Sequence, residues 1–116
     1  PKFNRKNILK IYQIKKHSGW CDDISSYCYN KYISLDKVLS RKISYENLWR
    51  QDNVYDLILT ISHNLKPTIK NKGSAIFIHC SFSDNRKTAG CIALKKRDLS
   101  YLIKTIDKGS YVNIKY

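Results

Sequence analysis

Acidic residues and long hydrophobic runs are scarce in this sequence. Its 116 residues include 9 Asp and Glu against 22 Lys and Arg, which gives a formal net charge of +13. The surface potential is therefore strongly positive and attracts polyanions, which suits nucleic acid, an acidic membrane face or a wall polymer carrying carboxylates. Apolar runs such as Ala75 to Ile78 are far shorter than the roughly 20 residues of a membrane-spanning helix. We therefore expect no membrane span in this segment.

The cysteines lack the spacing of a zinc ribbon or of a small disulfide scaffold. They stand at Cys21, Cys28, Cys80 and Cys91, and no two of them form a C-x-x-C pair. A bridge between Cys21 and Cys28 stays open, and so does a mixed cysteine and histidine zinc site, since spacing alone decides neither.

Length and composition indicate one domain. A chain of 116 residues with 42% hydrophobic content can build one ordinary core. The sequence starts at Pro1 without an initiator Met or an apolar leader, so we expect any export signal to lie outside it.

Alternating apolar and polar residues predict two central strands. Residues 57–63 alternate with period two, with Leu57, Leu59 and Ile61 on one face, as in a half-buried strand. In a second run at 75–82, His79 and Cys80 point to opposite faces, and Phe82 falls on the face of Cys80. Further short strands are expected at 8–12 and 111–114.

Two helices and a loop complete the predicted elements. A short helix near 44–51 can be capped by Ser44, with Glu46 in its first turn. A longer helix at 96–107 follows apolar residues at helical spacing. Residues 19–26 are predicted as a turn or loop, because Gly, Asp and Ser interrupt regular structure. The expected fold is mainly β.

One candidate site uses Cys80 as a nucleophile. His79, Cys80 and Arg86 have the H-C-x5-R spacing of cysteine phosphatases, in which backbone N–H groups and an arginine surround a phosphate. Such a loop usually needs glycines, whereas residues 81–85 include none and contain Phe82 and Asp84. We keep this activity as an alternative.

A second candidate site uses Cys91. A cysteine attacks as its thiolate, and His79 is the candidate base that would form it. Thr88, Ala89 and Gly90 lead into Cys91, and small residues there let the backbone N–H groups turn toward a developing oxyanion.

These residues resemble a known family. GSAIFIH at 73–79, followed by TAGCIAL at 88–94, is similar to the L,D-transpeptidase catalytic domain of the YkuD type. The upstream segments GWCDD at 19–23 and SYENLW at 44–49 occur in the same order in one branch of that family. The resemblance covers about residues 19–114 and is specific.

The resemblance implies a fold, a reaction and a set of site residues. The fold would be a YkuD-like mixed β-sandwich or barrel, and the enzyme would act on peptidoglycan stem peptides in the periplasm or cell envelope. A tetrapeptide would donate the acyl group and a second stem peptide would accept it, with no metal or organic cofactor and no specific nucleic acid. The implied roles are Cys91 as nucleophile, His79 as base, the N–H groups of Ala89, Gly90 and Cys91 as oxyanion hole, the Cys80 carbonyl as the group that orients His79, and His63 and Thr88 in the substrate pocket.

The sequence departs from the family pattern and leaves some alternatives open. Ala89 stands where many members have a second histidine, and Lys87 stands where this branch often has proline. By comparison with the family we expect residues 1–116 to form a single catalytic domain, or its carboxy-terminal part with the first strands before Pro1. A non-enzymatic basic module that binds polyanions remains the second alternative function, and transpeptidase and carboxypeptidase outcomes are not distinguished.

Overall fold

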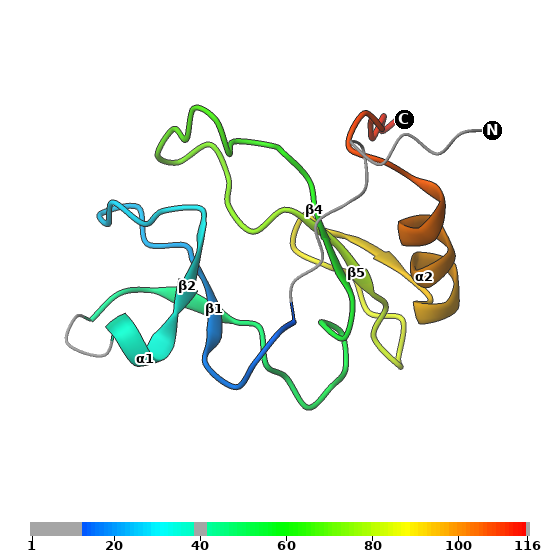
Figure 1. Ribbon diagram of the computed structural model, residues 1–116, viewed down its shortest axis with the longest axis horizontal. Helices are drawn as coiled ribbons and strands as arrows, with labels where there is room; N and C mark the ends of the chain where they lie inside the picture. Colours follow the sequence, from blue (N-terminus) through cyan, green and yellow to red (C-terminus); the bar gives the residue numbers. More distant parts are fainter. Residues whose placement is uncertain (1–12, 39–41, 116) are drawn as a thin grey trace.

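The computed structural model describes residues 13–38 and 42–115, and its architecture is mainly β, as predicted. Figure 1 shows β1 and β2 on one side of the molecule, and β4, β5 and α2 on the other. The predicted strand at 8–12 lies outside the described residues. Among those that are described, no helix is long and apolar enough to cross a membrane. The elements are β1 (Ser18–Cys21), β2 (Lys31–Ser34), α1 (Leu35–Val38), β3 (Tyr45–Asn47), β4 (Ile58–Thr60), β5 (Phe77–Cys80), β6 (Ile92–Leu94) and α2 (Lys96–Thr105).

The first sheet is antiparallel, with β1 between β2 and β3. The loop from β1 to β2 is closed by a disulfide between Cys21 and Cys28. It is also closed by the N–H of Asn30, which donates to the carbonyl of Cys21 over 2.8 Å. The predicted loop at 19–26 therefore begins later than expected, because its first residues belong to β1.

The helix predicted near 44–51 is wrong, because this segment contains β3. Glu46 pairs with Trp20 of β1, and the hydroxyl of Ser44 donates to Asp22 over 2.5 Å instead of capping a helix. So short a helix is marginal in isolation. Pairing with an available strand edge outweighs its weak local propensity.

The second sheet has the order β4-β5-β6, with β4 antiparallel and β6 parallel to β5. The predicted alternation is confirmed: Leu57, Leu59 and Ile61 all pack on one buried cluster, although only residues 58–60 are strand. The cluster is formed by Ile78, Cys80 and Leu99, with the first two from β5 and the last from α2. Helix α2 therefore covers one face of this sheet.

The chain after β6 agrees in part with the prediction. The helix expected at 96–107 is confirmed as α2 and ends at Thr105, where Ile106 turns to extended backbone. The strand expected at 111–114 is not formed: Tyr111 is 96% exposed and Ile114 66% exposed. These apolar side chains gain no burial, which removes the driving force for a strand.

A second core cluster joins the two sheets. It contains Leu48, Val54, Tyr55, Ala75 and Phe77, the last of which is fully buried. The ring of Trp20 from β1 meets the ring of Phe77 from β5 edge to face at 5.2 Å. The free face of the second sheet thus packs toward the first sheet, and the pocket described next lies there.

Candidate active site

The parallel register of β5 and β6 places His79 and Cys91 on the same face of the sheet. His79 pairs with Ala93, and paired residues of neighbouring strands share a face. Cys91 directly precedes β6 and stands two positions before Ala93, so the period of two gives it that face as well. Cys80 follows His79 and points the other way, into the cluster under α2.

A pocket of about 310 Å³ opens on this face. Its volume is at the lower end of the range for small-ligand sites. Both sheets contribute: Glu46 comes from β3, whereas His79 comes from β5. The lining residues are Glu46, Arg50, Val54, Tyr55, Ser74, Ala75, His79, Phe82, Lys87, Thr88, Ala89 and Cys91.

His79 is held in one orientation at the back of the pocket. It is 3% exposed, and its Nδ1 lies 2.7 Å from the carbonyl oxygen of Cys80. A carbonyl only accepts, so Nδ1 carries the proton and Nε2 is left as an acceptor in the neutral ring. The rings of Tyr55 and Phe82 pack edge-on against the imidazole, at 5.5 and 6.1 Å between centroids.

Cys91 presents a protonated thiol. Its Sγ donates to the carbonyl of Ala75 over 3.2 Å. Burial raises the pKa of the thiol, the backbone N–H of Phe77 lowers it, and the negative charge of Glu46 raises it again. The net direction is upward, so the thiol stays neutral at rest and a base has to remove its proton before attack.

The loop before Cys91 is fixed by its own contacts. The hydroxyl of Thr88 donates to the carbonyl of Cys91 over 2.5 Å. Gly90 has φ of +101°, a backbone conformation that residues other than glycine rarely adopt. Within the described part of the chain, no hydrogen bond uses the N–H of Ala89 or Gly90. Both N–H groups are free to meet an oxyanion.

His63 and the residues of the phosphatase alternative lie outside this arrangement. His63 does not line the pocket, and its Nε2 lies 2.8 Å from the carbonyl of Lys72. Cys80 is buried under α2, while Arg86 pairs with Asp84 at 3.0 Å on the surface. Phe82 turns toward His79 because β5 ends at Cys80, contrary to the face predicted for it.

Part of the backbone after Cys80 is also not available to surround a phosphate. The N–H of Ser81 donates to Leu94, that of Asn85 to Phe82, and that of Arg86 to Asp84. Backbone donors that a phosphate would need are thus used internally. The geometry argues against the phosphatase interpretation.

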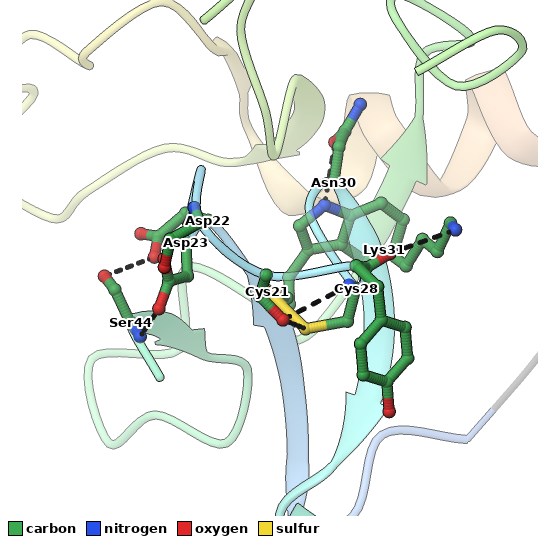
Figure 2. The surroundings of a disulfide bond; sticks show 11 residues. Cys21, Asp22, Asp23, Cys28, Asn30, Lys31 and Ser44 are labelled. Atoms are coloured by element: carbon green, nitrogen blue, oxygen red, sulfur yellow. Dashed lines mark hydrogen bonds between the residues drawn. A yellow bond between two sulfur atoms is a disulfide. The ribbon is translucent and has the colours of Figure 1, made fainter. Parts of the chain in front are cut away.

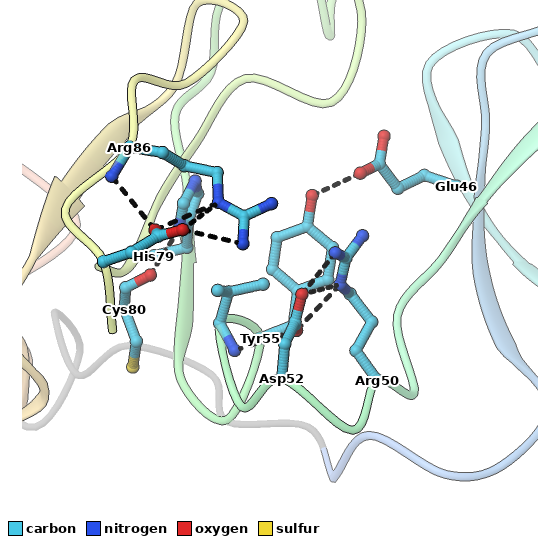
Figure 3. Close-up of polar contacts among 9 residues, drawn as sticks. Glu46, Arg50, Asp52, Tyr55, His79, Cys80 and Arg86 are labelled. Atoms are coloured by element: carbon cyan, nitrogen blue, oxygen red, sulfur yellow. Dashed lines mark hydrogen bonds and ion pairs between the residues drawn. The ribbon is translucent and has the colours of Figure 1, made fainter. Parts of the chain in front are cut away.

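Sequence reasoning missed Glu46 and Tyr55 as pocket residues. The Tyr55 hydroxyl donates to the Glu46 carboxylate, and Figure 3 shows this pair to the right of His79. Burial, followed by the bond to Glu46 and its charge, raises the pKa of Tyr55 far above its usual range, so the phenol remains a donor. Arg50 lies over the Tyr55 ring at 5.3 Å and pairs with Asp52 at 2.5 Å. The helix predicted near 44–51 gives Glu46 no contact with the pocket. Pairing of this segment with β1 as a strand brings Glu46 to the pocket.

Asn30 connects the disulfide loop to the backbone that contacts Cys91. Its side chain is buried and accepts from Trp20 Nε1 at 2.9 Å and from the N–H of Ala75 at 3.1 Å, and it donates to the carbonyl of Asn64 at 2.7 Å. Figure 2 shows Asn30 beside the Cys21–Cys28 bridge. Ala75, whose N–H donates to Asn30, is also the residue whose carbonyl accepts from Cys91.

Comparison with known proteins identifies the family of this chain. No group of three or more His, Cys, Asp or Glu able to hold a metal ion occurs in residues 13–38 and 42–115. No curated protein and no solved structure matches the chain. The model of the YkuD family, the L,D-transpeptidase catalytic domain, matches residues 9–114, and this family acts on the peptidoglycan of the cell wall. Since the match covers nearly all of the sequence, the chain belongs to the YkuD family of L,D-transpeptidase catalytic domains.

Proposed function

We propose that this protein is a cysteine L,D-transpeptidase that acts on peptidoglycan stem peptides through an acyl-enzyme on Cys91. The observation that carries the proposal is the placement of Cys91 and His79 on one face of β5 and β6, inside one pocket. The loop with Ala89 and Gly90, whose N–H groups make no hydrogen bond to any described residue, supports it.

In the proposed reaction His79 acts as the general base that deprotonates Cys91 during attack. Nε2 takes the proton of the Cys91 thiol as sulfur attacks the carbonyl carbon of the third stem residue, taken to be diaminopimelate. The N–H groups of Ala89, Gly90 and Cys91 stabilise the oxyanion. The C–N bond to the terminal D-alanine then breaks, His79 returns the proton to the leaving amine, and a thioester remains. An amine of a second stem peptide resolves the thioester to a cross-link, and water resolves it to a carboxylic acid.

The same proposal places the protein in the periplasm or cell envelope, as one catalytic domain. The Cys21–Cys28 disulfide supports an oxidising compartment. The core cluster shared by the two sheets supports a single folding unit, since Leu48 follows β3 in the chain and Phe77 belongs to β5.

The test follows the fate of a tetrapeptide. The full-length protein, Cys91→Ala and Cys80→Ala are each incubated with a peptidoglycan tetrapeptide, while released D-alanine and the mass of the acyl-enzyme are measured. We expect both signals in the wild type and in Cys80→Ala, and neither in Cys91→Ala. Cleavage of an aryl phosphate that depends on Cys80, without any acyl-enzyme, would overturn the proposal. Salt-sensitive retention on a polyanion as the protein's sole property would overturn it as well.

A further inference from the structure

Glu46 is an acidic residue that lines the same pocket as His79 and Cys91. It is the only acidic residue among those lining the pocket, in a chain with a formal charge of +13. Its negative charge raises the pKa of Cys91 and therefore disfavours the thiolate that has to attack. Glu46 therefore does not promote formation of the thiolate, and its geometry in the pocket points to contact with a ligand.

The carboxylate is held in place and has an open oxygen. Oε1 accepts from the hydroxyl of Tyr55, which is 7% exposed and packed against His79. No hydrogen bond or ion pair among the described residues uses Oε2 of Glu46. Arg50 is near, but its Nε and Nη2 are both bonded to Asp52. Glu46 is thus an oriented carboxylate with an open Oε2, and Arg50 interacts with its charge without an ion pair among the described residues.

The rest of the pocket rim is cationic. Arg50 and Lys87 line it and are exposed, so negative groups of a ligand are drawn to them and not to Glu46. A positively charged donor is the ligand group that Glu46 binds most strongly, because an oriented carboxylate in a half-buried site binds an ammonium through charge-assisted hydrogen bonds.

We propose that Glu46 is a specificity-determining residue that binds a primary ammonium group of the stem peptide. The proposal rests on the proposed function. A stem peptide presents such a group in two ways, as the side-chain amine of the residue that is acylated or as the amine of the acceptor that resolves the thioester. Either amine can donate to Oε2 in the same way. The donor amine is tested in the acylation of Cys91, and the acceptor amine is tested in the resolution of the thioester.

The test compares Glu46→Gln with the wild-type full-length protein. The amide keeps an acceptor for the Tyr55 hydroxyl and removes the charge. Donor tetrapeptides carry diaminopimelate with a free or an acetylated side-chain amine, and acylation of Cys91 is followed by mass. In separate reactions, resolution of the preformed acyl-enzyme is timed with an amine acceptor and with water. Asp107→Asn, in a surface turn outside the pocket, is the matched control for loss of one negative charge.

We expect Glu46→Gln to lower the preference for an ammonium-bearing partner about tenfold in one half-reaction, the effect of one charge-assisted hydrogen bond. Loss of the free-amine preference in acylation assigns the site to the donor, and loss of the amine-over-water preference assigns it to the acceptor. Ratios are compared, since removing the charge also acts on the Cys91 thiol in the same way for every substrate.

Unchanged ratios in both half-reactions, or ratios that Asp107→Asn changes equally, would overturn the role of Glu46. A wild type that acylates Cys91 with both peptides equally would overturn it for the donor and leave the transpeptidase proposal standing. A wild type that forms no acyl-enzyme with either peptide would overturn both.

Discussion

Replacement of Asn30 is expected to destabilise the fold strongly through its buried hydrogen bonds. The side chain bonds Trp20 at 2.9 Å, Ala75 at 3.1 Å and Asn64 at 2.7 Å. Each such bond contributes about 1 kcal/mol net, so losing all of them costs about 3 kcal/mol. Asn30 also has φ of 57°, a conformation that costs alanine about 1 kcal/mol. We expect Asn30→Ala to lower the free energy of unfolding by about 4 kcal/mol on these two terms.

Asn53 provides the matched control. It has φ of 62° and is exposed, and its side chain makes no hydrogen bond within the described part of the chain. Asn53→Ala therefore carries the conformational cost alone, about 1 kcal/mol. Both variants are unfolded in urea and followed by tryptophan fluorescence, with the free energy extrapolated linearly to water.

The difference between the two variants isolates the buried bonds. A gap of about 3 kcal/mol supports the argument. If Asn30→Ala and Asn53→Ala lose the same stability, the hydrogen bonds that join the disulfide loop to Ala75 contribute nothing, and the account of how the two sheets are connected is wrong.

Other changes test separate parts of the structure. Replacing Cys21 and Cys28 by serine should cost about 2.5 kcal/mol in urea unfolding, because the bridge spans 7 positions and closes a short loop in the unfolded chain; unchanged stability would contradict it. Leu99→Ala, at a fully buried site, should cost about 2–5 kcal/mol in the same assay, whereas a loss below 1 kcal/mol would show that α2 packs loosely. The rate of Cys91 alkylation should rise with pH, with a midpoint above about 8.5. The reason is that only the thiolate reacts and burial raises the pKa of this thiol. A lower midpoint would show that the resting thiol is not neutral.

Period-two patterning predicted the face of the second sheet but not the partners of its strands. Leu57, Leu59 and Ile61 lie on one face as expected, because burial of that face fixes their alternation. The parallel pairing of β5 with β6 is a contact between segments of the chain that no local pattern encodes. It is this pairing that puts Cys91 level with Phe77 and near His79.

The errors have a common physical origin in tertiary contacts. Ser44 and Glu46 have the residue types of a helix start, but the edge of β1 gives their backbone a partner and the segment is extended. Tyr111 and Ile114 have the types of a strand and have no partner among the described residues, so they stay exposed. At Ser44 and Glu46, pairing with β1 outweighs the helix propensity of the segment. At Tyr111 and Ile114, strand propensity alone does not form a strand.

The neutral state of the Cys91 thiol has a consequence for the redox chemistry of the whole chain. The protein contains a disulfide between Cys21 and Cys28 and, at the same time, free thiols at Cys80 and Cys91. Disulfide exchange and oxidation to sulfenic acid both proceed through the thiolate. Cys91 donates to the Ala75 carbonyl, and Cys80 is buried under α2. Both thiols are therefore slow to exchange with the bridge or to oxidise, so the bridge and a reduced Cys91 can persist together in an oxidising environment.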